Sequence, residues 1–198
     1  MFARNISDQA SHWDKQWTER TVNGLKMNVD KMSYIINEIS KRPHYSKATI
    51  LDIGCGSGIH AAIMASKYPS WSANWFGIDL SSKAVETARS FGLNAKVSNI
   101  YSFESDLKFD AFLFLDVLEH IEDYTRLAKK IMSLANERYF IFGNIPLYST
   151  SDHSNGGCEK SIGREELAQF LAMCGAKGFW QKIYGSFGFP YMIFEAVI

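Results

Sequence analysis

The sequence predicts a three-layer α/β fold, in which helices cover both faces of a mostly parallel sheet of seven strands. Between residues 48 and 142, short apolar runs alternate with segments of helical periodicity. Strands and helices in alternation form parallel sheets with right-handed crossovers. The run at 109–115 ends in five consecutive apolar residues, as expected of a strand that is buried on both faces. Near the C-terminus, a short Gly-rich joint at 185–190 separates two further apolar segments, which predicts an antiparallel hairpin that closes the sheet.

The expected elements follow in order along the chain. Strands are expected at 48–53, 75–79, 95–97, 109–115, 139–142, 178–184 and 191–197, and helices at 21–41, 59–67, 83–91, 124–134 and 164–174. The first helix rests on apolar residues that recur in steps of four and three, and Pro43 follows it as a stop. The polar segment 149–161 contains two adjacent glycines and is expected to be a loop.

Length and composition fit one globular domain. The 198 residues are 46% hydrophobic and 21% charged, as in proteins with a sizeable core. Lys and Arg together number 21, as do Asp and Glu, so the basic excess typical of nucleic-acid binding is missing. No apolar run has the length of a membrane span or the character of a secretory signal. Three cysteines without paired spacing favour a reducing compartment, and we expect a cytoplasmic protein.

A glycine-rich segment at 50–58 (ILDIGCGSG) lies where the first core strand is expected to turn into a helix. Glycines there allow a tight turn and a close approach of a ligand to the backbone. Dinucleotide sites use GxGxxG so that a pyrophosphate can rest on the helix N-terminus, whereas the third glycine position is Ile59 here. Asp52 would repel a pyrophosphate but suits the ammonium and sulfonium end of S-adenosylmethionine. The electrostatics favour the methyl donor.

Asp79 ends the second core strand. A carboxylate at this position can accept hydrogen bonds from both hydroxyls of a ribose. Because both cofactors contain a ribose, Asp79 indicates a nucleoside without choosing between them. The alternative is a surface residue that caps the following helix.

Three segments in this order resemble the motifs of one enzyme family. The segment 50–60 resembles motif I of the class I S-adenosylmethionine-dependent methyltransferases, and 76–81 (FGIDLS) resembles the acidic-loop motif that follows it. The segment 109–121 is similar to the strand-four motif of the branch that acts mostly on small molecules. The resemblance extends from about Lys47 to the end of the chain and implies the Rossmann-like methyltransferase fold. We therefore expect a single domain (1–198), with an N-terminal helical lid or cap segment (1–46) and a cofactor-binding core (47–198).

The resemblance also implies roles for individual residues. Asp52, Gly54, Cys55, Gly56 and Gly58 would surround the methionine part of the cofactor, Asp79 would hold the ribose, Leu80 would pack on the adenine, Asn99 and Ile100 would lie at the adenine edge, and Leu115 and Asp116 would form the floor near the reacting methyl. Many relatives have Asp where this chain has Asn99, and an amide there is still able to form a hydrogen bond.

Catalysis of methyl transfer needs few side chains. The reaction is an in-line displacement whose thioether leaving group needs no acid, so alignment and exclusion of water provide much of the catalysis. A base is needed only where the acceptor must lose a proton. His120 follows the strand-four edge, where the acceptor should lie, and its unperturbed pKa of about 6.5 suits proton abstraction near neutrality. Glu119 would orient a substrate or an imidazole. The alternative is that both residues pack against and cap the following turn.

No metal site is expected. Catechol-type methyltransferases bind magnesium partly through an Asp-Asn pair after strand five, and Gly143-Asn144 replaces that pair here. His153 and Cys158 lie in the expected loop, but two ligands at this spacing match no zinc pattern. A solvated loop histidine is the preferred interpretation.

Trp13 and Trp17 lie four positions apart and therefore share one face of a helix. They would form a lid over the cofactor, as N-terminal segments do in similar enzymes, or anchor the N-terminal helix to the core. The sequence leaves both interpretations open.

The first interpretation of function is methyl transfer from S-adenosylmethionine to an oxygen or nitrogen of a small molecule, without nucleic acid or membrane partners. Enzymes that methylate amino groups of nucleobases commonly carry Asn or Asp followed by Pro-Pro-Tyr or Pro-Pro-Phe after strand four, whereas 115–118 reads LDVL. A protein target and a catalytically silent cofactor-binding module stay open. A nicotinamide-dependent dehydrogenase is disfavoured by Ile59 and Asp52. Neither the acceptor nor the oligomeric state is indicated.

Overall fold

The structure, a computed structural model, describes residues 6–22, 29–69, 71, 74–147, 162–186 and 189–198. Its elements are α1 (Ile6–Val22), α2 (Val29–Ser40), η1 (Pro43–Ser46), β1 (Ile50–Ile53), α3 (Ile59–Lys67), β2 (Trp75–Asp79), α5 (Ser82–Ser90), β3 (Asn94–Val97), β4 (Phe109–Leu115), η2 (Leu118–His120), α6 (Tyr124–Leu134), β5 (Ala135–Pro146), α7 (Arg164–Met173), β6 (Phe179–Ser186) and β7 (Phe189–Val197).

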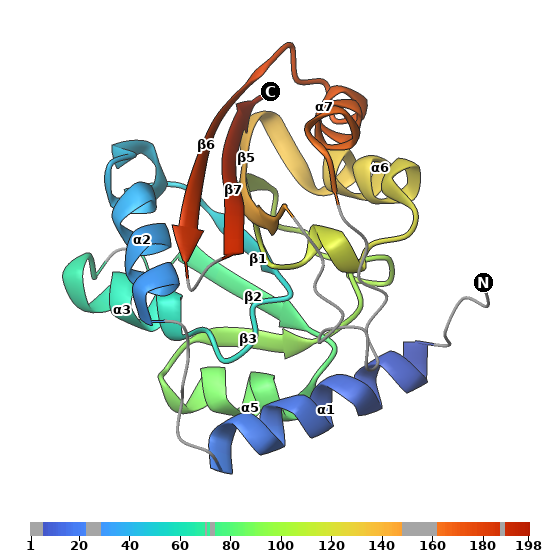
Figure 1. Ribbon diagram of the computed structural model, residues 1–198. Coiled ribbons are helices and arrows are strands. Elements are labelled where there is room, and N and C mark those ends of the chain that lie inside the picture. Colours follow the sequence, from blue (N-terminus) through green and yellow to red (C-terminus); the bar gives the residue numbers. More distant parts are fainter. Residues whose placement is uncertain (1–5, 23–28, 70, 72–73, 148–161, 187–188) are drawn as a thin grey trace.

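The described strands form one sheet in the order β3-β2-β1-β4-β5-β7-β6. The first five strands of this order run parallel, and β7 runs antiparallel to both β5 and β6. The predicted fold class is therefore confirmed, including the C-terminal hairpin (Figure 1). Because β1, β2, β4 and β5 are parallel, the residues that follow them gather at one edge of the sheet, which is where such folds bind ligands.

Alternate side chains of the sheet enter two separate cores. Leu51 and Phe112 pack with α6 and α7, whereas Ile50 and Leu113 pack with α2, α3 and α5. Helices α6 and α7 therefore cover one face of the sheet, and α2, α3 and α5 cover the other (Figure 1). None of the helices within the described residues is long and apolar enough to cross a membrane.

Several expected boundaries are shifted by one to four residues, as where β5 ends at Pro146 and not at residue 142. Two differences at the starts of elements are the ones that matter for the architecture. The helix expected at 21–41 begins at Val29 as α2, while α1 ends at Val22 and residues 23–28 lie outside the described part. β5 starts at Ala135, directly after α6, instead of at residue 139. Its first four residues are not buried, so they lack the apolar pattern from which the strand was predicted. The loop expected at 149–161 lies outside the described residues, as do His153 and Cys158.

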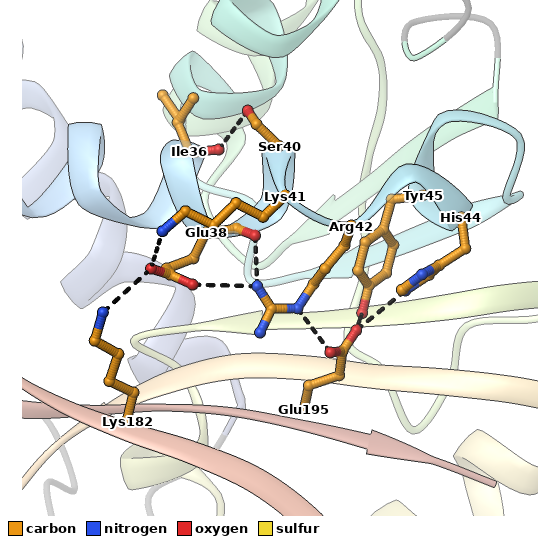
Figure 2. A network of polar contacts seen from close by, with 9 residues as sticks. All are labelled: Ile36, Glu38, Ser40, Lys41, Arg42, His44, Tyr45, Lys182 and Glu195. Atoms are coloured by element: carbon orange, nitrogen blue, oxygen red, sulfur yellow. Dashed lines mark hydrogen bonds and ion pairs between the residues drawn. The ribbon is translucent and has the colours of Figure 1, made fainter.

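A polar network fastens α2 and η1 to the C-terminal hairpin (Figure 2). The carboxylate of Glu195, on β7, accepts hydrogen bonds from Arg42 Nε at 2.7 Å and from the hydroxyl of Tyr45 at 3.0 Å. Burial, followed by the charge of Glu195, raises the pKa of Tyr45 well above its usual value. Glu38, which is buried on α2, is paired with Arg42 and Lys41. The segment 29–46 is thus packed against the sheet, whereas α1 lies beside α5 (Figure 1).

Candidate active site

The glycine loop between β1 and α3 has a backbone that glycine alone adopts readily. Gly54, Gly56 and Gly58 have φ angles of 69°, 55° and 66°, in the left-handed region that disfavours residues with a Cβ atom. The N–H groups of Gly54 and Cys55 both donate to the carbonyl of Ile78, at 2.8 and 3.0 Å. The loop is therefore held against the end of β2.

Asp79 joins this loop to the turn before α5. Its Oδ2 accepts a hydrogen bond from the N–H of Gly56 and its Oδ1 accepts one from the N–H of Ser81, both at 2.8 Å. Burial raises the pKa of Asp79 above its usual value, although these two hydrogen bonds act in the opposite direction. The backbone N–H of Leu80 acts on the carboxylate in the same direction. Because a carboxylate can accept about four hydrogen bonds, Asp79 retains capacity to accept one from a ribose. The ribose contact itself stays a prediction.

Asp52 has a structural role that the sequence did not indicate. Its side chain is completely buried, and its Oδ2 accepts a hydrogen bond from Trp75 Nε1 at 3.1 Å and lies 2.6 Å from His60 Nε2. One oxygen thus ties α3 and β2 together behind the loop. Among the described residues, Oδ1 has no hydrogen-bond partner. The interaction of Asp52 with the cofactor stays a prediction.

Cys55 lies in the loop as a buried, neutral thiol. Burial raises its pKa well above the usual value, and the charges of Asp52 and Asp79 raise it further. This environment favours packing over nucleophilic chemistry.

The predicted adenine-edge residues follow β3. The N–H of Ser98 donates to the carbonyl of Asp79 at 2.9 Å, which brings Asn99 to the same edge as the glycine loop. The side-chain oxygen of Asn99 accepts a hydrogen bond from the N–H of Tyr101 at 2.9 Å, so it shapes the turn. Ile100 is buried in the core, and Leu80 is half-buried.

The end of β4 places a carboxylate between two partners that are distant in sequence. Asp116, directly after Leu115, has a φ of 55°, which is strained for a residue other than glycine. Its Oδ1 accepts a hydrogen bond from Asn144 Nδ2 at 2.6 Å, and its Oδ2 forms an ion pair with Lys31 of α2. The side chain of Asp116 is therefore fixed from β5 and from α2.

His120 lies at the end of η2 and is covered by α1. The ring of Trp13 meets its imidazole edge-on, with the centroids 5.0 Å apart and the planes at 77°. Glu119 beside it is buried. The structure thus brings the predicted base candidate under the N-terminal helix, at the same edge as Asp116.

Helix α1 crosses the candidate site from the glycine loop to η2. A Cβ atom built on Gly56 would lie 2.5 Å from Cζ2 of Trp17, so this indole covers the glycine. Between the two tryptophans, Asp14 accepts hydrogen bonds from Ser81 Oγ at 2.6 Å and from the N–H of Lys83 at 3.1 Å. Although partial burial raises the pKa of Asp14, the hydrogen bonds lower it overall. A carboxylate at this N-terminus of α5 is favoured by the helix dipole.

Most of the predicted site residues therefore lie at one edge of the sheet, whereas Asp52 is buried behind the glycine loop and Ile100 lies in the core. The structure adds Asp14 and Lys31, which the sequence analysis did not single out. Both are charged residues on amphipathic helices, where such side chains usually face solvent, and no local motif marks them. Within the described residues, no three His, Cys, Asp or Glu side chains lie together in a way that could hold a metal ion.

Comparison with known proteins identifies the type of domain. The methyltransferase domain family matches residues 26–189. A ubiquinone biosynthesis O-methyltransferase of Rickettsia felis is 33% identical over 107 residues, which are 50% of this chain and 41% of that protein. The chain thus spans less than half the length of this relative.

Solved structures show the same fold at low sequence identity. Magnesium protoporphyrin IX methyltransferase from Synechocystis with bound S-adenosylhomocysteine has a TM-score of 0.76 at 16% identity, covering 97% of this chain and 98% of that one. The N-methyltransferase NodS from Bradyrhizobium japonicum, in complex with S-adenosylhomocysteine, has a TM-score of 0.65 at 13% identity, covering 93% and 97%.

Proposed function

The chain belongs to the methyltransferase domain family, and we propose that it transfers the methyl group of S-adenosylmethionine to an oxygen or nitrogen of a small molecule. The observation that carries the proposal is the pairing of the left-handed glycine loop with Asp79, whose carboxylate binds the N–H of Gly56. This arrangement offers a close backbone approach and a ribose acceptor at one point. The named relatives, which include O- and N-methyltransferases, support the reaction type.

The residues at the sheet edge fit this cofactor. The three cradle glycines carry no side chains of their own, so a ligand can approach their backbone once α1 opens. The buried Oδ1 of Asp52, unpartnered among the described residues, adds negative potential behind the loop. When bound, the cofactor supplies an electrophilic methyl: the acceptor forms a bond to the methyl carbon as the carbon–sulfur bond breaks, and the bonding electrons remain on sulfur. Leu115 and Asp116 would line the floor, Asn99, Ile100 and Leu80 the adenine edge, and α1 would exclude water.

We further propose that α1 acts as a lid, in which Trp17 covers the cradle, Trp13 covers His120 and Asp14 holds the helix to α5. The packing of both tryptophans against predicted site residues supports a lid over a purely structural anchor. A lid has to open for the cofactor to exchange. The strength of the Asp14 contacts would then influence the exchange rate.

Replacing Asp14 with alanine is expected to speed the release of S-adenosylhomocysteine about fivefold, because partly exposed charged hydrogen bonds contribute about 1 kcal/mol. Stopped-flow tryptophan fluorescence measures this rate. Asp8→Ala changes an exposed carboxylate on the same helix and should leave the rate unchanged. Equal release rates for the two variants would show that Asp14 does not hold the lid.

For acceptors that lose a proton, we propose His120 as the general base. His120→Ala is expected to lower turnover about 100-fold, the lower range for general-base catalysis, while the affinity for S-adenosylhomocysteine stays within about twofold, since catalytic protonation is not part of cofactor binding. His120→Phe keeps an aromatic ring beneath Trp13 but cannot accept a proton. If the phenylalanine variant recovers the turnover of the wild type, His120 acts only in packing.

The function is tested with S-adenosylmethionine labelled on its methyl group. We expect label to appear in at least one member of a panel of phenols, carboxylic acids and amines. Label that appears only in added RNA or protein would favour a macromolecular target, and a nucleic-acid enzyme would also be retained on RNA in a salt-sensitive way. Cofactor binding without transfer to any of these would favour a silent binding module.

A further inference from the structure

Three tyrosine rings from α2, β6 and β7 stack beside the end of β4. Tyr34 lies over Tyr184 with centroids 4.4 Å apart and planes at 13°, and Tyr184 lies beside Tyr191 at 5.5 Å and 24°. Lys31, the ion-pair partner of Asp116, has its Nζ 4.2 Å from the ring centroid of Tyr191. The tyrosine stack is therefore continuous with the edge at which methyl transfer is proposed.

The hydroxyl of Tyr184 lacks a hydrogen-bond partner among the described residues. The residue is only 8% exposed, and an unpaired polar group that is buried costs about 1–3 kcal/mol. Burial raises the pKa of Tyr184 far above its usual value, with the charge of Asp116 as the next cause. The hydroxyl is thus a neutral donor, and it lies close enough to Asp116 to be affected by its charge.

A second orphaned atom belongs to the same group of residues. Asn144 is completely buried, and its Oδ1 has no partner in the described part of the chain, although its Nδ2 binds Asp116. Asn144 of β5 is thus a second residue beside Asp116 with an unpaired polar atom. A phenylalanine at position 184 would form the same stack without the cost of the hydroxyl, so this atom weakens the free protein unless a bound molecule pairs with it.

We propose that Tyr184 determines acceptor specificity by donating a hydrogen bond to an oxygen of a flat aromatic acceptor that lies against the tyrosine stack. Aromatic rings favour stacked or edge-on contact with such a surface. A ring hydroxyl can accept a hydrogen bond, which matches the unpaired donor of Tyr184. The proposal rests on the proposed methyl transfer, because the acceptor has to lie beside Asp116.

The first test measures the thermal stability of the ligand-free protein. Tyr184→Phe is expected to raise the Tm by about 2–4 °C, because it removes an unpaired buried hydroxyl. The matched control is Tyr139→Phe, since the buried Tyr139 donates to the carbonyl of Cys174 at 2.6 Å. The control should lower the Tm. A decrease for Tyr184→Phe as well would show that its hydroxyl is satisfied in the free protein, which would overturn the proposal.

The second test measures binding of phenol and cyclohexanol by ligand-observed NMR to protein saturated with S-adenosylhomocysteine. We expect the wild type to prefer phenol, and Tyr184→Phe to lose about fivefold to tenfold in phenol affinity, as for a buried hydrogen bond. Tyr139→Phe should bind phenol as the wild type does. If S-adenosylhomocysteine binds but phenol does not, or binds Tyr184→Phe equally well, the acceptor site is wrong. If S-adenosylhomocysteine itself fails to bind, the proposed function fails instead.

Discussion

Asp79→Ala is expected to weaken the binding of S-adenosylhomocysteine by about 1.5–3 kcal/mol, roughly tenfold to more than a hundredfold, because hydrogen bonds to a charged carboxylate are lost. Two effects act together in this variant. The ribose would lose its proposed acceptor, and the N–H groups of Gly56 and Ser81 lose the oxygens that hold the loop and the turn in place. Calorimetric titration measures the affinity, and circular dichroism checks that the fold is intact.

Asp110→Ala is the matched control for this prediction. Its carboxylate accepts a hydrogen bond from the N–H of Thr49 at 2.9 Å and one from Asn136 at 2.6 Å, and it lies at the opposite edge of the sheet, near the start of β4. We expect a lower unfolding free energy but unchanged cofactor affinity. An Asp79→Ala protein that is folded and binds as tightly as Asp110→Ala would remove Asp79 from the ribose site.

Gly56→Ala is expected to weaken S-adenosylhomocysteine binding by at least about tenfold, because it combines a backbone strain of about 1–2 kcal/mol with a steric clash. The φ of 55° disfavours alanine, and the new Cβ would lie 2.5 Å from Cζ2 of Trp17. The glycine loop or α1 therefore has to move from its position in the structure, which would disturb the proposed cofactor site. Calorimetry measures the affinity, and tryptophan fluorescence reports on the lid.

Gly92→Ala separates strain from the steric effect. Gly92 has a φ of 77°, and a Cβ atom there would have nothing within 4 Å. This variant should lose about 1 kcal/mol of unfolding free energy from backbone strain alone, while its cofactor affinity remains that of the wild type. Equal affinities for Gly56→Ala and Gly92→Ala would mean that the cradle does not contact the cofactor.

Most of the fold could be predicted because it depends on local patterns. The strands at Trp75–Asp79 and Phe109–Leu115 and the helices at Ile59–Lys67 and Tyr124–Leu134 have the expected bounds, since burial on one or two faces sets their periodicity. The predicted length of β5 was too short at its start because residues 135–138 are mostly exposed and polar. Their place in the strand follows from tertiary structure, which apolar patterning does not record.

The candidate site also contains residues that local sequence patterns predict and residues that they do not. The glycine loop and Asp79 are local signals at strand ends, and the parallel sheet brings them together. Asp14 and Tyr184 acquire their roles from partners far away in sequence, such as Ser81 for Asp14 and Tyr34 for Tyr184. For Asp52, the sequence indicated a role for the negative charge, but it did not indicate that the side chain is buried against His60 and Trp75.

The central claim is that the glycine loop binds S-adenosylmethionine and not a dinucleotide. Calorimetric titration of the purified protein with S-adenosylhomocysteine, with NAD as the parallel ligand, tests it most directly. We predict that S-adenosylhomocysteine binds with a dissociation constant in the micromolar range, which corresponds to a binding free energy of about −8 kcal/mol. NAD should give no measurable heat. Binding of NAD alone would contradict the interpretation of the loop and, with it, the proposed methyl transfer.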